Sequence, residues 1–234
     1  MDQRALVSEA RRAIASSPVF KGMPETLVEK LADTAIFERY DSPSVVIRAG
    51  ESTSFARYVR TGYGFLRSES KDGRELQLAR TGEGQWFGWV LVFSPLQVEK
   101  DHWASAGTEY IAFPKSALLE IAEIWPQVYH NAFLDTGRMV QGILRWVWTF
   151  HLSSDDEKVA KLIVQMLPPK LRKGRYCLTC SQADLASLCG FGRQAVNRHL
   201  TVLEEKSLII RAYRKIEIPD VERLRAYAER DELI

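Results

Sequence analysis

The chain has 234 residues, of which 46% are hydrophobic and 26% are charged, and its net charge is +2. This composition is typical of a folded protein with room for two domains and excludes extensive disorder. The first ten residues hold no apolar signal segment, and no run reaches the roughly eighteen apolar residues of a membrane span, so we expect a cytoplasmic protein with no membrane partner.

The N-terminal half of the sequence predicts a short helix followed by many strands. Leu27, Val28 and Leu31 lie at helical spacing within residues 18–35. Beyond Ile36, short β-prone runs alternate with turn residues, and Asp72 and Gly73 form a hairpin signal. The six runs are residues 45–47, 56–59, 64–66, 75–79, 86–87 and 110–113. This pattern predicts a small β-barrel or β-roll.

Residues 125–150 predict one long helix, with Pro126 in its first turn, where a missing N–H is tolerated. Heptads counted from Phe133 place mostly apolar side chains at positions a and d. These side chains are Phe133, Val140 and Val147 at a, and Thr136, Ile143 and Phe150 at d. We favour a parallel coiled-coil dimer. The alternative is a single amphipathic helix that packs on its own β-roll.

The C-terminal part predicts two helices separated by a tight turn. After a hinge at residues 153–157 and a helix at 158–167, Ser181 can cap a helix that ends at Gly190. A second helix starts near Gly192 and buries one apolar stripe. That stripe consists of Val196, Leu200 and Leu203.

The opposite face of this second helix is polar and carries Arg193, Gln194, Asn197 and Arg198. Such side chains can read base edges in the major groove of double-stranded DNA, Arg pairing with guanine and Gln or Asn with adenine. A helical hairpin with a solvated polar face is the alternative interpretation.

Residues 208–218 predict two short strands around a basic tip that holds Arg211, Arg214 and Lys215, as in the wing of a winged helix. Residues 158–215 contain twelve Lys and Arg against three Asp and Glu, an excess of nine positive charges in a chain of net charge +2. Positive charge is therefore concentrated where DNA phosphates would lie.

The whole pattern resembles a known family. Segments 48–51, 58–62, 72–75 and 82–88 are similar, in order and spacing, to the cyclic-nucleotide-binding β-roll of the Crp/Fnr regulators, and residues 178–218 look like that family's winged helix-turn-helix. The resemblance implies an α+β fold with three parts. They are a β-roll sensor at 1–124, a dimerisation helix at 125–152 and a winged helix-turn-helix DNA-binding domain at 153–234.

The resemblance also implies a function. We expect a sequence-specific DNA-binding transcription regulator that acts as a homodimer on a palindromic operator, and not an enzyme. RNA polymerase would be a partner if it is an activator. Bases would be read by Arg193, Gln194 and Arg198 with help from Asn197, although the family often has Glu at the Gln194 position. The expected phosphate contacts are Ser181, Arg211, Arg214 and Lys215. The expected dimer contacts are Phe133, Val140, Ile143, Val147 and Phe150.

The sensor departs from the cyclic-nucleotide-binding members of the family. Trp89 stands where those members have Glu, and Lys100 with Asp101 replaces their Arg-Ser pair. Because a carboxylate repels a phosphate and Lys lacks the fork of Arg, we do not expect cyclic AMP binding in the familiar mode. A small-molecule effector and any cofactor stay unidentified. Candidate pocket residues are Trp86, Trp89, Lys100, Trp103, Ile143 and Leu144, and the alternative for the tryptophans is the core.

The remaining chemistry of the sequence is sparse. Cys177, Cys180 and Cys189 are expected to be structural, and the four histidines have no spacing that suggests a metal site. We find no nucleophile motif and no phosphate-binding loop. A second functional hypothesis is a ligand- or redox-binding regulatory module whose DNA-binding part is vestigial.

Overall fold

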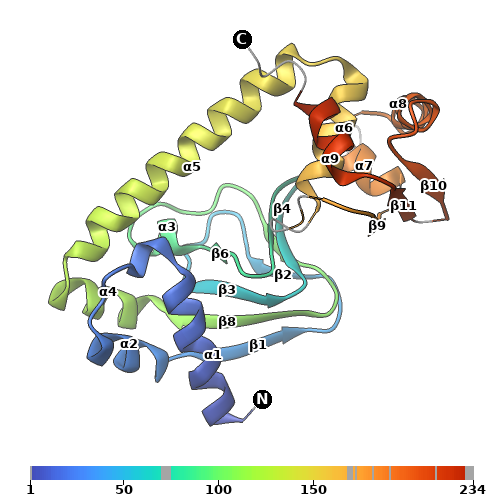
Figure 1. Ribbon diagram of the computed structural model, residues 1–234. Coiled ribbons are helices and arrows are strands. Elements are labelled where there is room, and N and C mark those ends of the chain that lie inside the picture. Colours follow the sequence, from blue (N-terminus) through green and yellow to red (C-terminus); the bar gives the residue numbers. More distant parts are fainter. Residues whose placement is uncertain are drawn as a thin grey trace. The chain divides into compact units, whose positions relative to one another are not determined.

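The computed structural model describes residues 2–69, 75–167, 171, 173–180, 182–189, 191–213 and 215–229. The chain forms two compact units, Met1–Ser68 with Gln77–Gln141, and Glu69–Leu76 with Gly142–Ile234 (Figure 1). Strands and helices are mixed in both units, and the expected α+β fold class is confirmed. The Asp72–Gly73 hairpin turn predicted from the sequence lies outside the described residues.

The N-terminal unit contains two four-stranded sheets whose described pairings are antiparallel. The first sheet has the order β1 (Ile36–Tyr40), β8 (Thr108–Pro114), β3 (Phe55–Thr61) and β6 (Trp86–Phe87). The second has the order β2 (Ser44–Ile47), β7 (His102–Ala104), β4 (Tyr63–Glu69) and β5 (Glu75–Gly82). All six expected runs are strands, whereas β1 and β7 were not predicted.

Helices cover one face of the first sheet. They are α1 (Gln3–Ser16), the 3-10 turn η1 (Pro18–Phe20), α2 (Glu25–Ala32), α3 (Trp89–Val92) and α4 (Lys115–Ile124). Asp2 begins α1 by accepting a hydrogen bond from the backbone N–H of Ala5 at 2.8 Å. Ile14 and Leu31 pack with Ile111 and Phe113 of the sheet in one hydrophobic core. The predicted helix around Leu27 is confirmed as α2, and α1 was missed.

The other face of the first sheet holds a buried ion pair. Arg57 Nε and Nη2 donate to the two carboxylate oxygens of Glu38 at 2.7 and 3.1 Å. Glu38 lies on β1 and Arg57 on β3, so the pair crosses the intervening strand β8. Val59, Ala104 and Tyr110 form a small core beside it.

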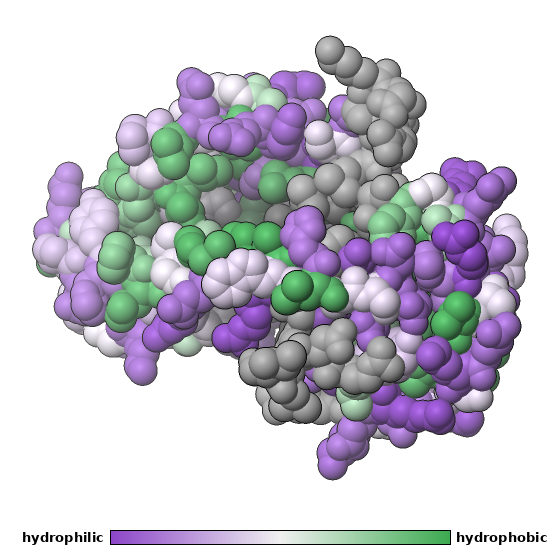
Figure 2. Space-filling view, turned by 90° about the horizontal axis from the view of Figure 1, so that it is seen from above, coloured by the Kyte–Doolittle hydropathy of each residue, from purple (hydrophilic) through white to green (hydrophobic). Residues whose placement is uncertain are grey.

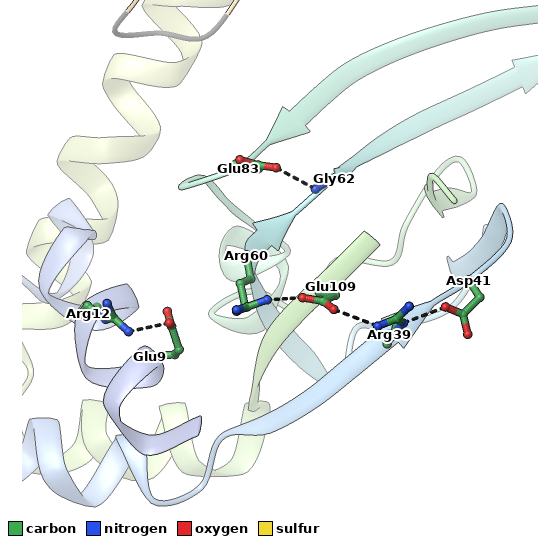
Figure 3. Close-up of polar contacts among 8 residues, drawn as sticks. All are labelled: Glu9, Arg12, Arg39, Asp41, Arg60, Gly62, Glu83 and Glu109. Atoms are coloured by element: carbon green, nitrogen blue, oxygen red, sulfur yellow. Dashed lines mark hydrogen bonds and ion pairs between the residues drawn. The ribbon is translucent and has the colours of Figure 1, made fainter. Parts of the chain in front are cut away.

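The rim of the same unit carries exposed ion pairs. Glu109 bridges Arg60 and Arg39, and Arg39 also contacts Asp41 at 2.7 Å (Figure 3). Arg39 and Asp41 are largely solvated, with 59% and 78% of their side chains exposed, whereas only 15% of the Glu109 side chain is exposed. Pairs of this kind contribute little to stability, about 0 to 1 kcal/mol.

His102 lies within this unit with its ring 5.5 Å from that of Phe87. Burial, together with the positive charge of Arg57, lowers the pKa of His102. The unfolded chain, with an ordinary His pKa of about 6.5, therefore binds more protons than the folded chain, and stability falls as the pH drops below that value.

We expect His102→Gln to weaken this acid sensitivity. Urea unfolding at about pH 7.5 and about pH 5.5 measures it, because the window starts at the ordinary pKa of about 6.5. The exposed His130 supplies a matched control variant, His130→Gln. Equal acid sensitivity in wild type and His102→Gln would contradict this role of His102.

One long helix, α5 (Gln127–Leu152), follows the N-terminal elements, in agreement with the sequence prediction. Val128 and Ala132, in its first two turns, belong to the N-terminal core. The next helix, α6 (Asp155–Gln165), begins with a capping box in which Glu157 accepts from the Ser154 N–H at 2.9 Å. Residues 153–157, expected as a hinge before a helix at 158–167, thus contain the N-cap and the first residues of α6.

The C-terminal unit packs helices and a small sheet around a second core. Its further elements are β9 (Tyr176–Thr179), α7 (Gln182–Cys189), α8 (Arg193–Glu205), β10 (Ile210–Ala212), β11 (Lys215–Ile218) and α9 (Val221–Ala228). The antiparallel sheet has the order β10-β11-β9. Val159, Leu185, Leu200, Ile209 and Leu224 are fully buried in this core. The two predicted wing strands are confirmed as β10 and β11.

Candidate nucleic-acid interface

The helix pair α7 and α8 forms the centre of the candidate site. Gly192 is the N-cap of α8, as the sequence predicted. The predicted stripe of Val196, Leu200 and Leu203 is buried, with at most 1% of each residue exposed. The helix is therefore held in the domain by one apolar face, and its opposite face is available to solvent.

The exposed face of α8 carries all four side chains predicted to read bases. Arg193, Gln194, Asn197 and Arg198 are exposed, and they lie in the first two turns of the helix. The structure thus brings these four residues together on one surface. Two guanidinium groups and two amides offer both donors and acceptors to base edges.

The wing lies next to this helix in the chain and pairs through β11 with β9. Its register places Ile210 opposite Glu217 and Ala212 opposite Lys215. Lys215 is exposed, as a phosphate contact requires. Ser181 and Arg214, the other two expected phosphate contacts near this surface, lie outside the described residues.

Sequence reasoning missed one residue of this surface. Tyr213, between β10 and Arg214, is 90% exposed, which is unusual for a large aromatic side chain. Its position between two β-prone runs with flanking basic residues was the available signal. A phenol at a wing tip can stack on a sugar or donate a hydrogen bond to a phosphate oxygen.

Four polar side chains connect α7, α8 and β10, and we call Gln182, Asn197, Glu204 and Arg211 the wing network. Arg211 donates from Nε to Glu204 Oε2 at 2.7 Å and from its backbone N–H to Glu204 Oε1 at 2.9 Å. Its Nη2 lies 2.6 Å from Glu204 Oε2. Its Nη1 donates to Asn197 Oδ1 at 3.0 Å. Gln182 Nε2 donates to the same oxygen at 3.1 Å.

The wing network changes the expectation for Arg211. The sequence suggested that Arg211 contacts phosphates, but its guanidinium is engaged by Glu204 and Asn197. Hydrogen bonds from the backbone and side chain of Arg211 also lower the pKa of Glu204, which keeps that carboxylate ionised at neutral pH. These contacts use three of the five N–H donors of the guanidinium and hold it against α8.

The tryptophans expected near an effector pocket are not gathered in one site. Trp86 donates from its indole N–H to the Ala13 carbonyl at 3.2 Å and stacks on Phe113 with ring centroids 5.0 Å apart. Trp89 is 8% exposed and belongs to the same core. These two residues therefore take the core positions that the sequence left as the alternative.

The other pocket candidates lie elsewhere. Trp103 points to the opposite face of β7 from the buried Ala104, and its ring lies under the guanidinium of Arg67 at 5.2 Å. Lys100 is exposed, and the Asp101 carboxylate accepts a hydrogen bond from the Ala49 N–H at 2.8 Å. Ile143 and Leu144 lie on α5 and are about half exposed.

Known proteins are similar both to the C-terminal domain alone and to most of the chain. Residues 157–227 match the family of Crp-like helix-turn-helix domains. The cAMP-activated global transcriptional regulator CRP of Pasteurella multocida is 21% identical over 176 residues, which are 73% of this chain and 84% of that protein.

Two solved structures share the fold over most of the chain. The structure of FixK2 from Bradyrhizobium japonicum has a TM-score of 0.69 at 21% identity and covers 82% of this chain and 96% of its own. The c-di-GMP responsive global regulator CLP of Xanthomonas campestris has a TM-score of 0.66 at 17% identity and covers 84% and 99%.

Residues 157–227 therefore belong to the family of Crp-like helix-turn-helix domains, and the relatives support a Crp/Fnr-type transcription regulator. As a Crp/Fnr regulator it is a DNA-binding protein and not an enzyme. The helix pair α7–α8 lies within the matched domain and is its helix-turn-helix.

Three further observations concern this Crp/Fnr regulator. Cys177 is exposed and Cys180 is buried, so the two thiols face different surroundings. Within the described part of the chain, no three His, Cys, Asp or Glu side chains form a group able to hold a metal ion. Among the described residues, none of the helices combines the length and the apolarity that crossing a membrane requires.

Proposed function

We propose that this Crp/Fnr regulator acts in the cytoplasm as a homodimer that binds a palindromic operator. In this proposal residues 1–124 are the sensor, 125–152 the dimerisation helix and 153–234 the DNA-binding domain. The observation that carries the proposal is the polar, solvent-facing side of α8, where Arg193, Gln194 and Arg198 project above a buried stripe. This is the arrangement of a recognition helix in the major groove.

In the proposed function, different residues contact the bases and the phosphates. Arg193, Gln194 and Arg198 read bases with help from Asn197, because these side chains share one exposed face. Ser181, Arg214 and Lys215 contact phosphates, which position the domain without carrying sequence information. Selection from a random-sequence DNA library tests the proposal. A palindrome with half-sites about 34 Å apart supports it, and the absence of any enriched sequence contradicts it.

The wing gives a prediction that separates the two kinds of contact. Replacing Lys215 with alanine should weaken binding to all DNA sequences alike. The slope of log affinity against log salt concentration should fall by about one, since each neutralised phosphate releases roughly one counterion. Fluorescence anisotropy at several salt concentrations measures this slope. A loss confined to the preferred sequence would argue against a phosphate role.

Helix α5 supports the dimer part of the proposal. It carries exposed apolar side chains along its length: Tyr129, Phe133, Leu134, Met139, Val140, Ile143, Leu144, Trp148 and Leu152. Phe133 is 76% and Trp148 is 67% exposed. Figure 2 shows hydrophobic residues gathered on the face of the molecule seen from above. Monomeric soluble proteins seldom expose so large an apolar surface.

Most of the dimer contacts expected from the sequence belong to this exposed surface. Phe133, Val140 and Ile143 are exposed, and Val147 is partly buried. The side chain of Phe150 is not among those that the structure describes. A second copy of α5 would cover these residues by knobs-into-holes packing, and the two-fold axis would then set the spacing of the two recognition helices.

Replacing Val140 with glutamate should dissociate the dimer, because it places two unpaired carboxylates in an apolar helix interface. We expect the dimer dissociation constant to rise by at least about 100-fold, which corresponds to roughly 3 kcal/mol. Sedimentation velocity over a concentration series measures it. Gln141→Glu adds the same charge at the outward-facing b position and should leave the dimer intact. A Val140→Glu protein that stays dimeric would exclude this helix as the interface.

We also propose that the sensor does not bind cyclic AMP in the family's familiar mode. The core position of Trp89 and the engagement of Asp101 by Ala49 support this, because neither residue offers the ribose or phosphate contact of the cyclic-nucleotide-binding members. Equilibrium dialysis with labelled cyclic AMP tests it. Saturable binding that Lys100→Ala abolishes would contradict the proposal.

A further inference from the structure

The wing network determines the orientation of a side chain on the recognition surface. Within this network, the Glu204 carboxylate contacts three donors of Arg211. The Nε donor lies 2.7 Å from Oε2 and the backbone N–H donor lies 2.9 Å from Oε1, and Nη2 is the third. Glu204 belongs to the last turn of α8 and Arg211 to β10. The carboxylate therefore restrains the guanidinium, because Nε and Nη2 both contact Oε2 while the backbone N–H of the same residue holds Oε1.

The guanidinium in turn fixes the amide of Asn197. An arginine side chain has only donors, so the Asn197 atom that lies 3.0 Å from Arg211 Nη1 is the oxygen Oδ1. The same oxygen accepts from Gln182 Nε2 at 3.1 Å. A carbonyl oxygen has two lone pairs, and both are now used. The group that Asn197 retains for another molecule is its Nδ2 amine, with two N–H donors.

A donor-only amide recognises a different base from a free asparagine. The familiar pairing of asparagine with adenine needs the amide oxygen to accept from N6 while Nδ2 donates to N7. Guanine instead presents two adjacent acceptors, O6 and N7, in the major groove, whereas cytosine presents only a donor there. With Oδ1 saturated, Nδ2 can donate to two acceptors of guanine but only to N7 of adenine, so the chemistry of Asn197 favours guanine.

We propose that Asn197 is a specificity-determining residue that selects guanine over adenine, because Arg211 and Gln182 occupy its amide oxygen. This inference rests on the proposed function. Arg211 is then a positioning residue and not a phosphate ligand. This reverses the adenine preference that the sequence suggests for an asparagine at this place.

The test starts with the full-length wild-type chain and a random-sequence duplex library. In the enriched sequence, the base pair whose preference Asn197→Ala abolishes marks the contact. Four duplexes that differ only at that base pair then give dissociation constants. We expect wild type to bind the guanine duplex about tenfold more tightly than the adenine duplex, a typical value for one base contact. Arg211→Met should reduce this ratio to about two or less, since a freed Oδ1 accepts from adenine N6.

Two further variants make the test specific. Gln182 lies at the exposed start of α7, so Gln182→Ala frees one lone pair of Oδ1 without changing the wing and should also lower the guanine-to-adenine ratio. Lys215→Met, on the same wing, should keep the ratio and lower the salt slope by about one, whereas Arg211→Met should keep the slope. Thermal unfolding of each variant establishes that it is folded.

The outcomes separate the inference from the proposed function. If the wild-type chain enriches no sequence, the proposed function fails and the inference fails with it. If a sequence is enriched but the Asn197-dependent base pair prefers adenine, the inference alone is overturned. It is also overturned if both Arg211→Met and Gln182→Ala keep the wild-type ratio.

Discussion

Replacing Glu38 with alanine should lower the free energy of unfolding of the N-terminal unit by about 3 to 5 kcal/mol. The variant leaves the Arg57 guanidinium without its carboxylate, and only 7% of that side chain is exposed. A buried charge that loses its partner is costly, because protein atoms have replaced the water that would otherwise solvate it. Urea unfolding followed by tryptophan fluorescence measures the loss, since Trp86, Trp89 and Trp103 belong to this unit.

Two comparisons test the cause of this loss. Asp41→Ala removes one of the two carboxylate partners of the exposed Arg39, the other being Glu109, and should cost no more than about 1 kcal/mol (Figure 3). The double replacement Glu38→Leu with Arg57→Met should be less destabilising than Glu38→Ala, because no buried charge then lacks a partner. A double variant as unstable as Glu38→Ala would show that packing, and not the uncompensated charge, causes the loss.

Replacing Arg198 with alanine should weaken binding to the selected operator by about 1 to 3 kcal/mol for each half-site. Arg198 is exposed near the start of α8, where a guanidinium can donate two hydrogen bonds to guanine O6 and N7. A homodimer on a palindrome loses this contact twice, so the summed effect is among the largest expected for a single surface substitution. Anisotropy titrations with the operator and with a scrambled duplex measure it.

The scrambled duplex distinguishes the two possible roles of Arg198. A base-reading residue loses affinity for the operator and keeps its affinity for the scrambled sequence, whereas a phosphate ligand loses both alike. Arg223→Ala removes an exposed arginine of α9 outside the proposed interface and should leave the operator preference unchanged. Unchanged operator affinity in Arg198→Ala would contradict the assignment of bases to α8.

Local patterns in the sequence predicted the DNA-binding unit well. The stripe of Val196, Leu200 and Leu203 has helical spacing, and burial follows directly from that period. The two wing strands are bounded by residues with clear strand and turn preferences. Helix α1 was missed because alanines make up part of its buried face, and alanine is a weak signal of burial.

Contacts between residues that are far apart in the chain could not be predicted from the sequence. Glu38 and Arg57 meet only because β1 and β3 both pair with β8, and strand order cannot be read from composition. Arg211 looked like a free cation in the sequence, and its engagement by Glu204 and Asn197 depends on how the wing turns back toward α8. The tryptophans are separated for a related reason, since Trp86 and Trp89 pack in the core of the first sheet whereas Trp103 lies on β7 of the second sheet.

The wing network also bears on how such regulators are re-engineered. One way to transfer an operator preference would be to exchange residues 193–198 for those of another family member. Here a grafted helix would still meet Gln182 and Arg211 of the host, and these two side chains would impose their own hydrogen bonds on whatever occupies position 197. The transferable unit is therefore the helix together with positions 182, 204 and 211.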